Sequence, residues 1–181
     1  HELNKLIELL TIHETAFFRN RAHFELLTDR IIPEICARNS TSRSIRAWSA
    51  GCSTGQEAYS IAITLMESLP DYQSWQLEVL ATDISQRALD IASAGLYQPG
   101  AMRNVSQKIL DRYFEVVNGR YRIKDNVRKI VRFEHLNLVK EPFPVAALRP
   151  LDLILCENVT IYFKVDSTRR VIRNFFEVLQ D

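Results

Sequence analysis

The apolar residues of this chain recur with two periods, one typical of a helix and the other of a strand. The helical period predicts helices at residues 2–10, 21–37, 55–69, 85–94, 106–113 and 166–179. Short apolar runs predict strands at residues 45–49, 77–81, 130–133 and 151–156. Because strand and helix alternate from residue 45 onward, the pattern predicts an α/β fold with a parallel sheet and right-handed crossovers. Ser53 or Thr54 is available as the N-cap of the helix at residues 55–69.

One stretch departs from this alternation. The pair Asn118-Gly119 separates two short strand-like runs, residues 114–117 and 121–123, and this dipeptide is a strong signal for a tight hairpin turn. We therefore expect a small antiparallel hairpin subdomain, inserted at about residues 113–134. The expected organisation is an N-terminal helical region at residues 1–37, followed by a main domain at residues 38–181 that contains the insertion.

Composition excludes several classes of protein. The 181 residues are enough for one buried core, and 23 basic against 22 acidic side chains leave a net charge of +1, so no global field attracts a nucleic acid. No apolar run approaches the roughly 20 residues that span a bilayer, and the amino terminus has no export pattern. The three cysteines form no C-x-x-C pair, which argues against a metal site and against a disulfide framework. We expect a cytoplasmic protein that neither inserts into a membrane nor binds nucleic acid.

Candidate ligand-binding residues lie where the predicted strands end. Ala50, Gly51 and Gly55 lie in the turn that follows the first predicted strand, where backbone can approach a ligand, although a tight structural turn explains the same glycines. Asp83 follows the second strand, at a position where nucleotide-binding sheets place an acid for the ribose hydroxyls. A helix cap for residues 85–94 is the alternative interpretation of Asp83.

Further candidate residues lie at the start of a helix or directly after a predicted strand. Glu57 lies in the first turn of a helix, where the helix dipole alone favours an acid, but it could also face a ligand ammonium. Asn137 and Leu138 follow a strand and suit the edge and face of a purine. The run E-N-V-T-I-Y-F at residues 157–163 follows the most apolar strand, so chemistry is expected at that edge of the sheet.

Five of these segments together resemble the chemotaxis-receptor glutamate methyltransferases, the CheR family. The matching segments are T-A-F-F-R at residues 15–19, the glycine-turn segment at 48–62, A-T-D-I at 81–84 with A-G-L-Y at 94–97, N-L at 137–138, and N-V-T-I-Y-F at 158–163. They occur in the order of the family and cover most of the chain. The resemblance implies a Rossmann-like, class I S-adenosylmethionine-dependent methyltransferase sheet.

The resemblance also implies an activity. S-adenosylmethionine would be the methyl donor and S-adenosylhomocysteine the product, and side-chain carboxylates of glutamates in the cytoplasmic helices of chemotaxis receptors would be the acceptors. A glutamate carboxylate is ionised at pH 7, with an ordinary pKa of about 4.3, so it needs no general base to attack the methyl group. This chemistry is consistent with motifs that contain no catalytic histidine or cysteine.

Roles for the motif residues follow from the same resemblance. Asp83 would hold the ribose, Asn137 and Leu138 the adenine, and Glu57 the methionyl ammonium. The turn with Ala50, Gly51 and Gly55 would lie under the cofactor, and Asn158 would also contact it. Tyr162 would lie near the methyl group, and Arg19 would hold a carboxylate of either the cofactor or the substrate.

Glu157 departs from the family pattern. Family members commonly carry arginine at this position, so the charge beside the expected site is reversed. This reversal motivates an alternative, a signalling module that binds S-adenosylmethionine but has lost or altered methyl transfer. We also expect the domain to be truncated at both ends, with residues 1–37 a remnant of the family's N-terminal helical region and the last strands of the sheet missing.

Two expectations concern partners. Residues 103–132 hold nine basic side chains against three acidic ones, and Arg120 and Arg122 lie on the predicted hairpin. This patch could steer an acidic receptor helix, although a solvated surface explains the same charges. The strand at residues 151–156, or a neighbour of it, would be left as an open sheet edge, through which the chain could self-associate.

Overall fold

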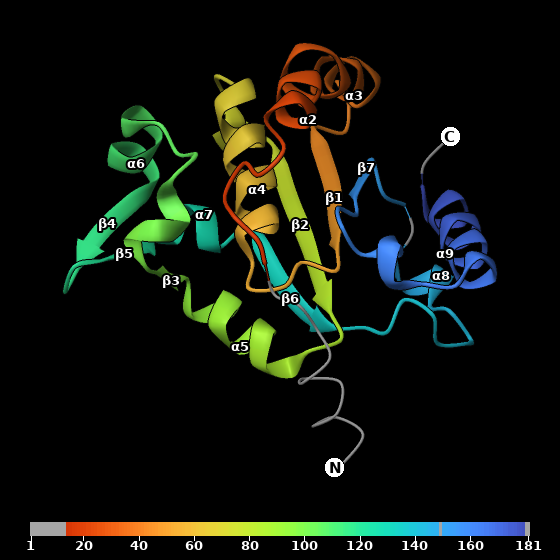
Figure 1. The fold of residues 1–181 in the computed structure, drawn as a ribbon. Coiled ribbons are helices and arrows are strands. Elements are labelled where there is room, and N and C mark those ends of the chain that lie inside the picture. Colours follow the sequence, from red (N-terminus) through yellow and green to blue (C-terminus); the bar gives the residue numbers. More distant parts are fainter. Residues whose placement is uncertain (1–13, 149, 180–181) are drawn as a thin grey trace.

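A four-stranded parallel sheet forms the centre of the protein. The computed structural model describes residues 14–148 and 150–179 (Figure 1). The strands are β1 (Ser44–Ala50), β2 (Gln76–Asp83), β6 (Val131–His135) and β7 (Leu153–Leu155), in the order β6-β2-β1-β7. The chain builds outward from β1 through β2 to β6 and then returns to place β7 on the other side of β1. The carboxyl ends of β1 and β7 therefore flank a topological switch point, where open α/β sheets bind ligands.

Helices cover both faces of this sheet, which confirms the predicted α/β class. They include α4 (Gln56–Ser68), α5 (Gln86–Ala94), α8 (Val145–Leu148) and α9 (Val165–Val178). Successive strand residues point to opposite faces, so Ala47 belongs to the core under α4 while Trp48 joins Val171 of α9 in a second core. Helix α4 packs between the sheet and the N-terminal helices, and this position explains why it is buried almost all round.

The helix predicted at residues 21–37 is confirmed, with one irregularity. It consists of α2 (Arg21–Leu26), a π-helical turn η1 (Leu27–Ile31) and α3 (Ile32–Arg38) in unbroken succession. Pro33 lies in the first turn of α3 and has no N–H to donate to the carbonyl four residues earlier, which accounts for a wider turn at this point. The helix predicted at residues 2–10 lies outside the described residues.

A second, antiparallel sheet lies to one side of the parallel sheet (green in Figure 1). Its strands are β3 (Leu96–Tyr97), β5 (Arg120–Ile123) and β4 (Phe114–Val117), in the order β3-β5-β4. Asn118 and Gly119 both have positive φ, 50° and 73°, as the predicted hairpin turn requires. The two-residue β3 was not predicted, and β6, within the expected insertion, pairs with β2 in the main sheet. The remaining short elements are η2 (Tyr72–Ser74), η3 (Pro99–Met102), α6 (Gln107–Tyr113), α7 (Asp125–Arg128) and η4 (Thr160–Tyr162).

Two helix caps decide between alternatives left open by the sequence. The N-cap of α4 is Gly55, at φ 94°, and not Ser53 or Thr54; among the described residues, no side chain caps this helix. The N-cap of α5 is Ser85, whose hydroxyl accepts the Ala88 N–H at 3.0 Å. Asp83 is therefore not the N-cap of that helix.

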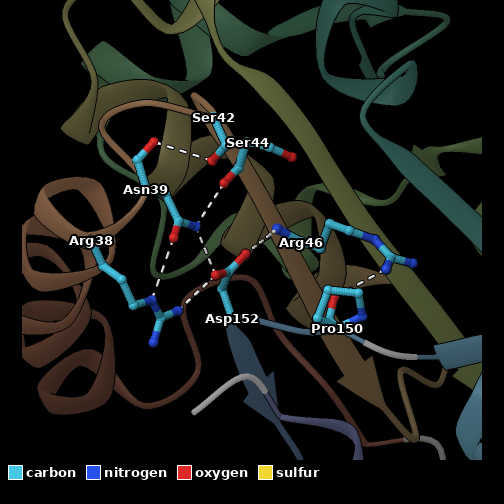
Figure 2. A network of polar contacts seen from close by, with 7 residues as sticks. All are labelled: Arg38, Asn39, Ser42, Ser44, Arg46, Pro150 and Asp152. Atoms are coloured by element: carbon cyan, nitrogen blue, oxygen red, sulfur yellow. Dashed lines mark hydrogen bonds and ion pairs between the residues drawn. The ribbon is translucent and has the colours of Figure 1, made fainter.

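The N-terminal helix is joined to the main sheet by a buried carboxylate (Figure 2). Asp152, whose side chain is 5% exposed, accepts hydrogen bonds from Arg38 and from the Asn39 amide, both at 2.7 Å. Its second oxygen accepts the Arg46 N–H at 2.8 Å. A single side chain thereby connects the end of α3, the start of β1 and the start of β7.

Strand β7 is shorter than the predicted strand at residues 151–156. In the described part of the sheet it pairs with β1 on one side, and Leu151 forms an isolated bridge with Leu179. Self-association through this edge stays a prediction. In the described ranges, we find no helix with the length and apolar character of a membrane span.

Candidate functional site

A cavity of about 430 Å³ opens at the carboxyl ends of the parallel strands. Five segments line it: the N-terminal segment at residues 14–24, the turn after β1, and the segments that follow β2, β6 and β7. Of the residues predicted for the site, those that line the cavity are Arg19, Gly51, Glu57, Asp83, Asn137, Leu138, Asn158 and Tyr162. Residues far apart in the sequence thus meet in one space, of a size suited to a small-molecule ligand.

The turn after β1 brings backbone close to this space. Gly51 has φ 82°, and a Cβ at this position would overlap the Val159 side chain. The N–H groups of Gly51 and Cys52 both donate to the Thr82 carbonyl, at 2.8 and 2.9 Å, which fixes the turn against β2. Gly51 therefore meets both a conformational and a steric requirement for glycine.

Ala50 and Gly55 of the same turn do not line the cavity. Ala50 is fully buried in the core at the end of β1. At Gly55 a Cβ would lie 2.8 Å from the Ala92 Cβ and 3.0 Å from the Tyr97 hydroxyl oxygen, so the glycine allows α4 to pack closely on α5. Both residues shape the turn, and a cofactor-binding role for them stays a prediction.

Asp83 is held by backbone groups on two sides. One carboxylate oxygen accepts the Ser53 N–H at 2.8 Å, and the other accepts the Ser85 N–H at 2.9 Å. Each oxygen retains further acceptor capacity, so the carboxylate can still accept two hydroxyl hydrogens from the cavity. Asp83 thus combines a structural contact with a position suited to ligand binding.

Glu57 is the most perturbed acid of the cavity. Burial raises its pKa to about 7, and the charge of Glu157 acts in the same direction; hydrogen bonds from the Ser49 hydroxyl and the Glu157 backbone act against both. The Ser49 hydroxyl donates to Glu57 Oε1 at 2.5 Å. A desolvated carboxylate beside a second acid favours a cationic partner, as the ammonium interpretation requires.

Asn137 and Leu138 form the wall that follows β6. The Asn137 Oδ1 atom accepts the Val139 N–H at 3.1 Å, and this contact fixes the side chain while its amide hydrogens keep their donor capacity. Leu138 is 5% exposed and belongs to the core around Trp48. The wall offers a polar edge and an apolar surface, which suits a purine.

Arg19 and Tyr162 also line the cavity, from the N-terminal segment and from η4. Arg19 lies between Phe18 and α2, and its Nη1 donates to the Glu14 carbonyl at 2.6 Å. Tyr162 ends η4 and is 60% exposed. Asn158 is exposed at φ 60°, a left-handed conformation that asparagine tolerates. A guanidinium and a phenol ring thus face the same space as the acids.

Several lining residues were not predicted as site residues: Glu14, Thr15, Ala16, Phe24, Cys52, Ser53, Ile84, Leu136, Val139, Val159, Ile161 and Phe163. Most of them directly flank predicted positions, so their place after a strand was the available signal. Glu157, noted for its reversed charge, also lines the cavity.

Arg120 and Arg122 lie elsewhere. They belong to β5 of the antiparallel sheet, where they share one face of the strand, and they do not line the cavity. Arg122 pairs with Glu115 of β4 at 3.5 Å. Any contribution of these residues to binding a partner would come from a separate surface.

The strand order and the cavity at the switch point define a Rossmann-like sheet. The sequence profile of the family described as "CheR methyltransferase, SAM binding domain" matches residues 13–181, and the chain belongs to this family. The resemblance found in the motifs is thereby confirmed. The family's cofactor is S-adenosylmethionine, and the residues fit it: carboxylates for its ammonium and ribose, and an apolar wall with an amide for its adenine.

Relatives agree with this assignment. The chain is 35% identical to the "Probable chemotaxis protein methyltransferase" of Rhizobium etli, over 98% of the chain and 66% of that protein. It is 35% identical to "Chemotaxis protein methyltransferase 2" of Vibrio cholerae, over 98% and 62%, and 36% identical to the "Chemotaxis protein methyltransferase" of Borreliella burgdorferi, over 97% and 62%. The chain spans less than two thirds of the length of these relatives.

Proposed function

We propose that the protein transfers the methyl group of S-adenosylmethionine to glutamate side chains of chemotaxis receptors, forming methyl esters in the cytoplasm. The observation that carries the proposal is that residues suited to the cofactor and residues suited to the acceptor line the same cavity. Glu57, Asp83, Asn137 and Leu138 would hold the cofactor, whereas the Tyr162 segment would face the acceptor and Arg19 would hold a carboxylate of either one; all of them line the cavity. A cavity that only stores a cofactor would not need residues suited to the acceptor.

The chain's residues suit a transfer without a general base. When bound, S-adenosylmethionine supplies a methyl group on a positively charged sulfur, and the sulfur keeps the bonding electrons when the carboxylate oxygen takes the methyl. Because the acceptor carboxylate is already ionised, no side chain has to remove a proton, and Arg19 would hold and orient a carboxylate of either the acceptor or the cofactor. Opposite charges disappear during this step, so alignment and exclusion of water are the main contributions of the protein. The Tyr162 ring can shield the sulfonium by a cation–π contact.

The experiment is a transfer assay with radiolabelled S-adenosylmethionine and cytoplasmic receptor fragments. We expect base-labile label on the receptor, as a methyl ester gives. Binding of the cofactor without labelling of the receptor would instead support the module with lost or altered transfer. That alternative is not favoured, since the three relatives above are named as methyltransferases.

Tyr162 provides a matched pair of variants for the same assay. Tyr162→Phe keeps the ring and loses the hydroxyl, so it should retain more activity than Tyr162→Ala. An equal loss in both variants would assign the role to the hydroxyl, which would then orient the acceptor. Because Tyr162 is 60% exposed, neither change should affect folding.

The receptor helix would meet the protein through the basic surface of the antiparallel sheet. Arg120 and Arg122 lie side by side on β5, and methylatable receptor helices are acidic partners. Long-range attraction to such a surface raises association rates more than affinity.

A further inference from the structure

His23 and Glu157 contact each other across 134 positions of the sequence. The Nδ1 atom of His23, in α2, lies 2.5 Å from Oε1 of Glu157, two residues after β7. The other ring nitrogen of His23 lies 3.1 Å from the Asn20 side-chain amide nitrogen. The Glu157 side chain is 14% exposed and that of His23 is 55% exposed, so solvent reaches the contact from the His23 side.

The pair secures one end of the segment that carries Arg19. The other end is secured by Phe17, which is fully buried and packs edge-on against Tyr97 and Phe114 at ring distances of 4.9 and 5.2 Å. Arg19 is exposed and lies between these two anchors. Phe18 is also held, by its N–H to Ser60 Oγ at 3.0 Å and by its ring contact with Phe24. The pair of His23 with Glu157 adds a contact that joins this segment to the residues after β7.

The contact with His23 also affects the charge that Glu157 presents to the cavity. Glu157 shares the cavity with Glu57, Asp83 and Glu14, while Arg19 is the cation among the lining residues that the structure describes. The contact with His23 directs the Glu157 carboxylate toward α2. Without His23, this carboxylate could turn toward the other acids and toward an approaching acceptor carboxylate, which it would repel.

We propose that His23 and Glu157 form a latch that positions residues 15–24, including Arg19, against the cavity. Both are positioning residues, since they act through Arg19 and its neighbours. The inference deepens the proposed function and rests on it for the identity of the ligand. The latch can change ligand affinity by no more than the energy of the contact, so the effect is roughly two- to fivefold.

The test exchanges the two side chains. His23→Glu places two carboxylates face to face. Adding Glu157→His in the same chain restores a contact between one carboxylate and one imidazole, with the positions exchanged. We expect His23→Glu to weaken binding of S-adenosylhomocysteine, measured by calorimetry, by roughly two- to fivefold, and the exchanged double variant to recover most of the loss. Arg21→Gln is the control, because its pair with Glu25 lies on the same helix and is exposed. Binding unchanged in His23→Glu, or a double variant no better than that single variant, would overturn the latch.

A second measurement needs no ligand. Glu157→Gln keeps the size of the side chain and removes its charge, so it should fold. Hydrogen exchange at residues 15–24 should become faster in this variant and stay unchanged in Arg21→Gln. Unchanged exchange in Glu157→Gln would count against the latch, whereas a parent protein that binds neither the cofactor nor its product would contradict the proposed function instead.

Discussion

The Ser49 hydroxyl donates to Glu57 Oε1 at 2.5 Å, which ties the first turn of α4 to the end of β1. The same carboxylate receives a hydrogen bond from the Glu157 backbone, directly after β7. Glu57 is thereby fixed between the two strands that flank the switch point. Its pKa is nevertheless raised to about 7 because burial outweighs these hydrogen bonds.

This raised pKa predicts that Glu57 contributes less to stability without cofactor as the pH rises from about 4.5 to about 7. In the unfolded chain Glu57 loses its proton near its ordinary pKa of 4.5, whereas the folded protein holds it until about pH 7. Between these values the folded state binds more protons, so the Glu57 contribution to the free energy of unfolding decreases with increasing pH. Glu57→Gln should therefore be more stable than the parent at pH 8, by about 1–3 kcal/mol, and equal to it near pH 4. Urea unfolding at several pH values measures this.

Glu67 is the matched control for that titration. Partial burial raises its pKa, but hydrogen bonds from Tyr113 and Lys108 and the charge of Arg112 outweigh burial and lower it. Glu67→Gln should accordingly lose stability relative to the parent at neutral pH, the opposite sign. If both variants change stability in the same direction, the assignment of the Glu57 pKa is wrong.

Asp83→Ala should impair both binding and stability. The carboxylate is expected to accept the ribose hydroxyls, and its loss should weaken cofactor affinity by at least about tenfold. The Ser53 and Ser85 N–H groups would also lose their acceptor, at a cost of about 1–3 kcal/mol. Calorimetry and urea unfolding separate the two effects. Asp90→Ala, which removes an exposed acid bonded to Gln86 on α5, should change neither; unchanged affinity in Asp83→Ala would exclude the ribose role.

Asp152→Ala should be among the more destabilising single changes in the chain. It would leave the Arg46 N–H and one hydrogen of the buried Asn39 amide without their acceptor, and it would remove the ion pair with the exposed Arg38 (Figure 2). We expect a loss of about 2–4 kcal/mol in the free energy of unfolding. Arg30→Ala breaks the exposed pair with Glu34 and should cost less than about 0.5 kcal/mol. Similar losses in the two variants would show that the Asp152 contacts add little.

The elements that could be predicted are those with a strong local period. Strand β2 and helices α5 and α9 were predicted to within a few residues because their apolar spacing is unbroken. Strand β3 has two residues and no pattern of its own, so it could be found only from its pairing with β5. The cap of α4 was missed because Ser53 and Thr54 suggested a side-chain cap, whereas Gly55 begins the helix in a left-handed conformation.

The site residues likewise divide into those with a sequence signal and those without one. Residues directly after strands were predicted because all parallel strands deliver their ends to one edge, and they do line one cavity. Their individual roles stay predictions. The contact between His23 and Glu157 left no sequence signal, since it joins residues 134 positions apart that follow no common period. The backbone contacts of Asp83 were equally invisible, because a sequence does not show which N–H groups a fold leaves unpaired.

Reversing Arg120 and Arg122 to glutamate should slow association with acidic receptor fragments and leave cofactor affinity intact. The two side chains lie on β5, outside the cavity, so only long-range attraction should change. At low salt we expect a loss of roughly tenfold in the association rate. The difference should shrink at physiological salt, where the Debye length is about 8 Å. Reversing Arg169 and Arg173 of α9 makes the same change of net charge at the other side of the molecule (Figure 1). If that control slows association equally, the effect belongs to total charge, and the receptor docks on another surface.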